Sequence, residues 1–152
     1  ITDPNPEKQA MEILDKVWSM YEICGVSMLD ISVWKWMYAH PDAPAEQLKE
    51  ATIALSKEIW NKYYAPVFGV KDETVLAVYS HMISYPLYLS AYAFGQIIEF
   101  QLDQYLEGKN FANEVERIFR QGRLTPNQWM ILATGSPLTV EPMLEAVRQV
   151  IK

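Results

Sequence analysis

The sequence contains few of the residues from which most metal and catalytic sites are built. Its 152 residues include one cysteine and two histidines. The single Cys24 excludes an internal disulfide and a cysteine-rich zinc site. His40 and His81 lie far apart in the sequence, and neither has an acidic residue at the spacing of a metal site. We therefore expect this chain alone to bind no metal ion.

Other catalytic signatures are also missing from the sequence. It has no H-E-x-x-H, no G-x-S-x-G and no phosphate-binding glycine loop, so the residues alone specify no complete active site. The formal net charge is -6, and the basic residues are scattered. Nucleic acids and anionic membranes attract clustered lysine and arginine, so neither is expected as a partner. A peptide or another protein fits this composition better.

One long stretch without charge dominates what is present. Thr74–Ile98, TVLAVYSHMISYPLYLSAYAFGQII, contains no Asp, Glu, Lys or Arg. Rings with polar tips recur in it at positions i, i+4, i+7 and i+11: His81, Tyr85, Tyr88 and Tyr92. On a continuous helix these side chains would form one stripe. Pro86 interrupts the helix, so we expect either a kink or a new helix that begins near it.

Three interpretations of this charge-free stretch compete. A transmembrane helix is disfavoured by polar and helix-breaking residues within it: His81, three serines, Pro86, Gly95 and Gln96. A central core helix would bury its tyrosine rings and hydrogen-bond their hydroxyls to neighbours, and the pattern alone favours this interpretation. The third interpretation is the wall of a binding site, in which the row of rings faces a ligand.

The remaining chain predicts an all-α protein. Asn5 and Pro6 open a helix that could stop at Gly25, but we favour one long helix, or two nearly collinear ones, up to Ala39, where His40 and Pro41 end it. Further helices are predicted from about 45 to 63 or 64, from 111 to about 120, from 126 to 131 or 132 and from 140 to 151, with a loop at 65–69. The prediction is one domain, 1–152, a bundle of about six to seven helices around a central, uncharged, tyrosine-rich helix.

Several runs together resemble a known family. They are WKWMYAHPDAPAEQL, IWNKYYAPVFG, YSHMISYPLYLSAYAFGQIIEFQLDQYLEG and FRQGRLTPNQWMILATGSPLTVEPMLEAV. These runs span most of the chain and resemble the C-terminal part of the thimet oligopeptidase and oligoendopeptidase F family of zinc metallopeptidases. The Tyr-Ala-x-Gly element of that family corresponds to Tyr92, Ala93, Phe94 and Gly95. The family's C-terminal tail corresponds to Gly122 through Ala146.

The resemblance implies a role in cleaving short peptides. Members of that family hydrolyse them in a channel between two helical halves, using a zinc-activated water. By this resemblance Tyr92 would donate a hydrogen bond to the oxyanion, His81 would position the substrate, and Tyr85 and Tyr88 would line the channel wall. A phenol with a pKa near 10 stays protonated at neutral pH and suits that role.

The family's H-E-x-x-H and downstream ligand glutamate have no counterpart here. The resemblance therefore implies a C-terminal fragment of a longer peptidase whose zinc is held elsewhere. The expected partners are short peptides, the missing zinc-bearing part, or a homodimer mate that covers an exposed aromatic patch. The alternative is a non-catalytic helical module that binds peptides or proteins.

Overall fold

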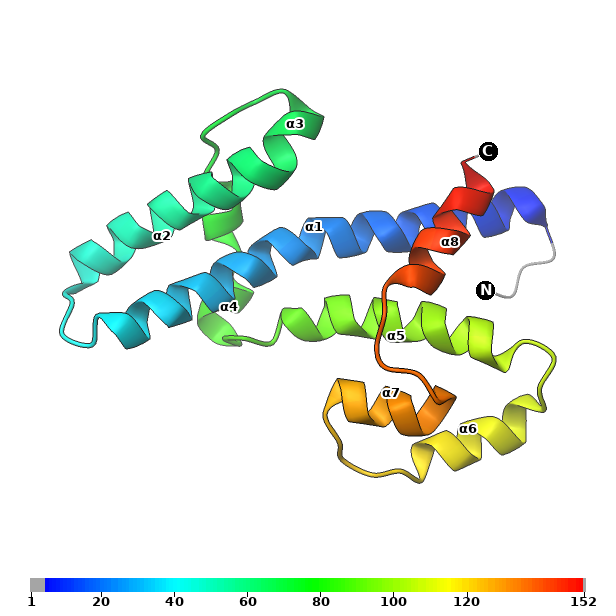
Figure 1. The fold of residues 1–152 in the computed structure, drawn as a ribbon. Coiled ribbons are helices and arrows are strands. Elements are labelled where there is room, and N and C mark those ends of the chain that lie inside the picture. The colour runs from blue at the N-terminus through cyan, green and yellow to red at the C-terminus, as the bar shows by residue number, and fades with distance from the viewer. Residues whose placement is uncertain (1–4, 152) are drawn as a thin grey trace. The chain divides into compact units, whose positions relative to one another are not determined.

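The computed structural model describes residues 5–151, and within this range every regular element is a helix and no strand is present. The predicted all-α class is confirmed. Six helices have nine or more residues: α1 (Pro6–Ala39), α2 (Ala45–Ile59), α5 (Ser90–Leu106), α6 (Phe111–Phe119), α7 (Pro126–Thr134) and α8 (Glu141–Val150) (Figure 1). Shorter segments are the π-helix η1 (Trp60–Tyr64), α3 (Ala65–Phe68), the 3-10 helix η2 (Val75–Val78) and α4 (His81–Ser84).

The chain divides into two compact units. One comprises Met20–Ala93, and the other comprises the described residues of Ile1–Ser19 and Phe94–Lys152. Helices α1 and α5 each contribute residues to both units. All four side chains of the predicted ring stripe belong to Met20–Ala93, so this unit contains the candidate site.

Helix α1 runs without interruption to Ala39, as the sequence analysis favours. The Asn5 side chain caps its start by accepting a hydrogen bond of 2.9 Å from the Glu7 N–H. Position 25 lies inside this helix and is a glycine, and a Cβ there would overlap the Tyr64 side chain. At the other end, His40 Nδ1 lies 2.8 Å from the Trp36 carbonyl oxygen, and the helix ends before Pro41. The sequence thus predicted both ends of this helix.

Two expectations about the unit Met20–Ala93 are wrong. The expected loop at 65–69 is the short helix α3, which starts with Pro66 in its first turn and ends at Gly69 with φ of 73°. Proline and glycine here mark the start and end of a helix turn rather than a loop. The expected central helix is broken, since η2, α4 and α5 are separate segments. Of the two possibilities at Pro86, a new helix is the one observed, and it begins at Ser90.

The charge-free stretch is also less buried than expected. The core of its unit consists of Val26, Leu29, Ile59, Tyr64, Leu76 and Leu89. Only Leu76 and Leu89 in that core come from Thr74–Ile98, and both alternate with exposed neighbours. Among residues 5–151, no helix combines the length and apolar character that crossing a bilayer requires. Ala77 and Met82 also pack, partly buried, against this core, and many other side chains of the stretch lie at the surface of its unit.

Candidate functional site

The four predicted side chains lie next to one another even though no single helix carries them. The ring centroids of His81 and Tyr85 are 5.8 Å apart, those of Tyr85 and Tyr88 are 6.3 Å apart, and those of Tyr88 and Tyr92 are 5.4 Å apart. These distances are typical of aromatic pairs in contact. We refer to these four residues together with Tyr79 as the ring row.

The ring row follows an irregular backbone between two helices. Tyr85 ends α4 with φ of -142° and ψ of 67°, and its N–H donates a 2.8 Å hydrogen bond to the His81 carbonyl. The chain then turns, with the Tyr88 N–H donating to the Tyr85 carbonyl at 3.2 Å. Tyr92 lies in the first turn of α5. Sequence spacing placed the rings on one helix face, whereas a turn brings them together.

Tyr79 belongs to this row but was missed by the sequence analysis. Its ring centroid lies 5.2 Å from that of His81. Its backbone is extended, with φ of -77° and ψ of 115°, just before α4. Counting back from His81 by three or four residues reaches Val78 or Ala77 instead. A search at helical spacing therefore could not identify it.

The tyrosine rings of the row are exposed, and His81 is partly buried. Tyr85, Tyr88 and Tyr92 have 61%, 52% and 47% of their surface accessible. The interpretation as a central core helix with buried tyrosines is therefore wrong. The partial exposure leaves ring faces and hydroxyls accessible to a ligand of this unit.

Electrostatics favours the protonated form of Tyr92. The adjacent Tyr88 phenol raises the pKa of Tyr92, because ionising both would place two negative charges side by side, and Tyr79 adds to this effect. An ordinary phenol is already protonated at neutral pH, and the upward shift favours the same state, in which the Tyr92 hydroxyl can donate a hydrogen bond. This is the state that a donor to a peptide carbonyl or an oxyanion needs.

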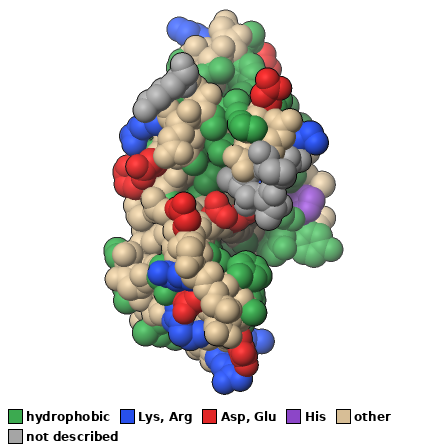
Figure 2. All heavy atoms as spheres, turned by 90° about the vertical axis from the view of Figure 1, so that its right-hand side faces the viewer, with side chains coloured by type: hydrophobic (Ala, Val, Ile, Leu, Met, Phe, Trp, Pro, Cys, Tyr) green, Lys and Arg blue, Asp and Glu red, His purple; other side chains and the backbone are tan. Residues whose placement is uncertain are grey.

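Exposed aliphatic side chains extend the surface beside the row. Val78 and Ile83, which flank His81 in sequence, are largely exposed, and Val75 is half exposed. Charged side chains are distributed differently: on the face drawn in Figure 2, acidic and basic side chains are interspersed rather than separated by sign. Because Thr74–Ile98 contains no charged residue, the exposed side chains that this stretch contributes beside the ring row are uncharged.

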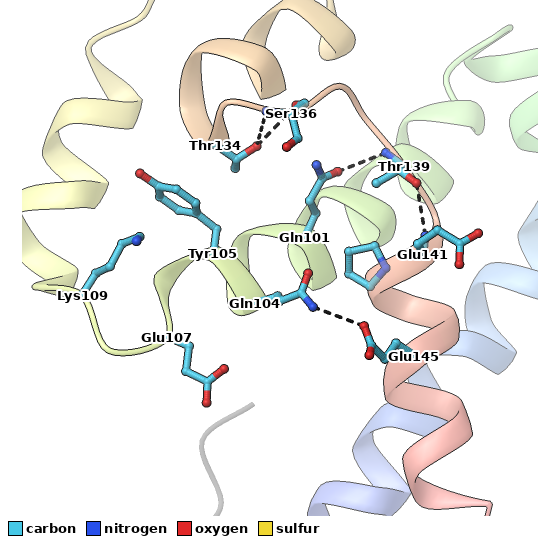
Figure 3. Close-up of a pocket in the computed structure, with 11 residues that line it drawn as sticks. Gln101, Gln104, Tyr105, Glu107, Lys109, Thr134, Ser136, Thr139, Glu141 and Glu145 are labelled. Atoms are coloured by element: carbon cyan, nitrogen blue, oxygen red, sulfur yellow. Dashed lines mark hydrogen bonds between the residues drawn. The ribbon is translucent and has the colours of Figure 1, made fainter.

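A polar pocket lies in the other unit. Its volume is about 580 Å³, and its lining includes hydroxyl, amide and carboxylate groups from α5, α8 and the segment between α7 and α8 (Figure 3). Gln101 is held there by the Thr139 N–H at 3.1 Å, and Gln104 donates to Glu145 at 3.4 Å. No residue of the ring row lines this pocket. The pocket and the candidate site therefore share no residue.

The described residues do not fit a zinc ion. Among residues 5–151, no group of three or more His, Cys, Asp or Glu side chains is placed to hold a metal. Cys24 is partly buried, and this burial raises the pKa of its thiol, which disfavours the thiolate that a metal binds. Zinc coordination would need ligands beyond these residues.

Comparison with known proteins leaves the family open. No family model, curated protein or solved structure matches the chain. Its fold and candidate site define an all-α protein with an exposed row of tyrosine and histidine rings. The relation to the oligopeptidases stays a prediction from the sequence runs quoted above.

Proposed function

We propose that this chain forms a peptide-binding wall of a zinc-dependent oligopeptidase, the class that its sequence runs resemble. The observation that carries the proposal is the ring row: the four predicted side chains are adjacent beside an irregular backbone, and Tyr85, Tyr88 and Tyr92 are exposed. Short peptides are the ligands that such a wall suits, since peptide side chains stack on rings and peptide carbonyls accept hydrogen bonds from phenols.

Within this proposal the residues have distinct roles. The Tyr92 hydroxyl donates a hydrogen bond to a substrate carbonyl oxygen and to the oxyanion that replaces it, and its raised pKa favours the protonated phenol. His81 positions the substrate, and Tyr85 and Tyr88 contact the peptide along the wall. Loss of one oxyanion donor typically costs about 2.7–4 kcal/mol in the transition state.

The chain would not supply a complete set of zinc ligands in such an enzyme, because its described residues contain no group of three or more His, Cys, Asp or Glu side chains placed to hold a metal. A segment with an H-E-x-x-H motif and a further ligand glutamate would have to provide them. The contribution of this chain is to bind and orient the peptide. Because the zinc ligands would come from another segment, the proposal can be tested by looking for that segment in the gene.

The first experiment is to read the coding sequence around these 152 codons. An upstream H-E-x-x-H followed by a ligand glutamate in the same reading frame supports the oligopeptidase. In the protein that this frame encodes, Tyr92→Phe should then lower kcat far more than it raises KM, because the lost donor acts on the transition state. Equal kcat for variant and wild type removes Tyr92 from the mechanism.

A non-catalytic helical module that binds peptides or proteins is the second candidate. The exposed aliphatic side chains Val75, Val78 and Ile83 favour it, because they extend the apolar surface beyond the ring row. A start codon close to the codon of Ile1, with no upstream metal motif, would support this candidate. Replacing Ile83 by serine should then weaken partner binding as much as Tyr92→Phe does, whereas the oligopeptidase proposal expects the larger effect at Tyr92.

A further inference from the structure

We propose that Asp30 is a positioning residue that holds Tyr85 and Tyr88 of the ring row in place through the backbone of Leu87. Asp30 lies on α1, far from the row in sequence, and nothing in the sequence pattern links it to the rings. Asp30 holds these two rings in place in the protein without ligand. Its consequence for peptide binding rests on the proposed function.

The Asp30 side chain is buried and aimed at the irregular segment. Only 2% of its surface is exposed, and Oδ2 accepts a 2.6 Å hydrogen bond from the Leu87 N–H. Removing a carboxylate from water costs free energy unless a donor compensates it. The Leu87 N–H is such a donor, and the bond is charge-assisted, which makes it stronger than a bond between neutral groups.

Leu87 adopts a conformation that needs this support. Its φ is 62°, in the left-handed region that non-glycine residues rarely occupy. The Leu87 carbonyl is held as well, because the Ser90 hydroxyl donates to it at 3.1 Å. Two residues further on, the fully buried Leu89 anchors the segment in the core. The turn is thus fixed by one contact at the Leu87 N–H and two contacts beyond it.

The positions of two rings depend on this turn. Tyr85 lies two residues before Leu87, and Tyr88 follows it directly. The separation of their ring centroids, 6.3 Å, is the widest in the row. Without the Asp30 acceptor, the Leu87 N–H would need water, and its φ would be free to return to negative values. The peptide planes on either side would rotate, and the two flanking rings would no longer keep their present separation. Asp30 therefore sets the geometry of the wall without being part of it.

The test uses ¹³C-labelled tyrosine NMR on the protein without ligand. Asp30→Ala removes the acceptor, whereas Asp30→Asn keeps an amide oxygen that accepts from Leu87. Tyr64→Phe is the control, because it removes a buried hydrogen bond of the same unit that does not involve Leu87. We expect Asp30→Ala to shift the Tyr85 and Tyr88 ring signals, and Asp30→Asn and Tyr64→Phe to leave both near their wild-type positions. Unchanged Tyr85 and Tyr88 signals in Asp30→Ala overturn the proposal.

A second measurement needs no variant and applies if Asp30→Ala does not fold. Leu87 lies outside the helices, so its amide would exchange rapidly with solvent if it were free. The Asp30 bond predicts strong protection from hydrogen exchange in the wild-type protein. An unprotected Leu87 amide contradicts the proposed positioning role.

Peptide binding separates this inference from the proposed function. The probe is a pool of six-residue peptides with capped ends and randomised uncharged residues. Asp30→Ala should weaken binding of the pool by about tenfold, because a displaced wall contact is costly, and Asp30→Asn should restore most of it. If the wild-type protein does not bind the pool, the proposed function fails. The NMR signals of Tyr85 and Tyr88 in Asp30→Ala then still test the positioning role of Asp30. If the wild-type protein binds and Asp30→Ala binds equally well, the positioning role fails.

Discussion

Two groups of tyrosines in the unit Met20–Ala93 differ in their hydrogen bonds and in their exposure to solvent. In the pair Tyr21 and Tyr64, each hydroxyl donates a 2.6 Å hydrogen bond to a backbone carbonyl, of Tyr63 and Tyr21 respectively. Their ring centroids are 4.9 Å apart. In the ring row, the rings contact one another, and Tyr85, Tyr88 and Tyr92 remain about half exposed. The pair joins two parts of the chain, whereas the row is open to a ligand.

The two groups also raise tyrosine pKa values for different reasons. Burial raises the pKa of Tyr64 to about 12, since its charged form would lose its contact with water. The pKa of Tyr92 is raised chiefly by the neighbouring Tyr88 phenol. The first shift is therefore coupled to folding, and the second belongs to the surface of the row. This difference leads to predictions that separate structural from ligand-binding tyrosines.

The largest expected effect is on the hydrogen-bonded pair Tyr21 and Tyr64. In Gly25→Ala the new Cβ would overlap the Tyr64 side chain, which must move and lose its bond to Tyr21. We expect the free energy of unfolding to fall by about 3 kcal/mol, as measured by urea denaturation. Gly95→Ala is the matched control, because a Cβ at Gly95, another helical glycine, meets no atom within 4 Å. Similar stability losses in both variants would show that Tyr64 does not constrain Gly25.

A smaller effect should appear at high pH. Below about pH 10, Tyr64 is protonated in both the folded and the unfolded chain. Between pH 10 and about 12 the unfolded chain loses this proton and the folded chain retains it, so the free energy of unfolding falls as pH rises. The loss should be on the order of 2 kcal/mol.

Tyr64→Phe isolates that contribution. The variant should be less stable than wild type at pH 7 by about 1 kcal/mol, because it lacks the hydrogen bond to Tyr21. It should also lack the part of the pH dependence that comes from Tyr64, and urea denaturation at pH 8 and at pH 11 measures both. The same fall with pH in variant and wild type would assign the loss to other groups.

Substitutions in the ring row should change stability least. Tyr85→Ser and Tyr88→Ser remove half-exposed rings, so each should lower the free energy of unfolding by about 0.5 kcal/mol or less. Thermal unfolding followed by circular dichroism provides the measurement. A loss of unfolding free energy as large as that of Gly25→Ala would show that the row stabilises the fold as the pair Tyr21 and Tyr64 does. It would contradict the distinction between the two groups.

The sequence predicted elements whose signals are local. The extent of α1 and its cap at Asn5 could be identified, because the residues that make them are neighbours in the chain. The presence of four rings in one row was also predicted. The resemblance to a peptidase family remains a prediction.

The geometry of the row depends on contacts between residues distant in sequence, and these could not be predicted. The break after α4 is maintained by Asp30, which is 57 residues from Leu87. The burial of Tyr64 depends on the space left by Gly25 in α1. Such pairings need the three-dimensional fold, because helical spacing reveals only neighbours within one helix. For the same reason the degree of exposure of the tyrosines was not apparent from their order.

The most direct test of the central claim is a titration of the capped, uncharged hexapeptide pool into protein with ¹³C-labelled tyrosines. Tyr92→Phe provides the variant, and Tyr38→Phe is its matched control, since Tyr38 is exposed on α1 and its ring contacts Trp34 rather than the row. We predict that the pool shifts the signals of Tyr85, Tyr88 and Tyr92 and leaves that of Tyr64 in place, and that Tyr92→Phe binds more weakly than Tyr38→Phe. Binding that shifts no ring-row signal, or that Tyr92→Phe and Tyr38→Phe show equally, would contradict the account.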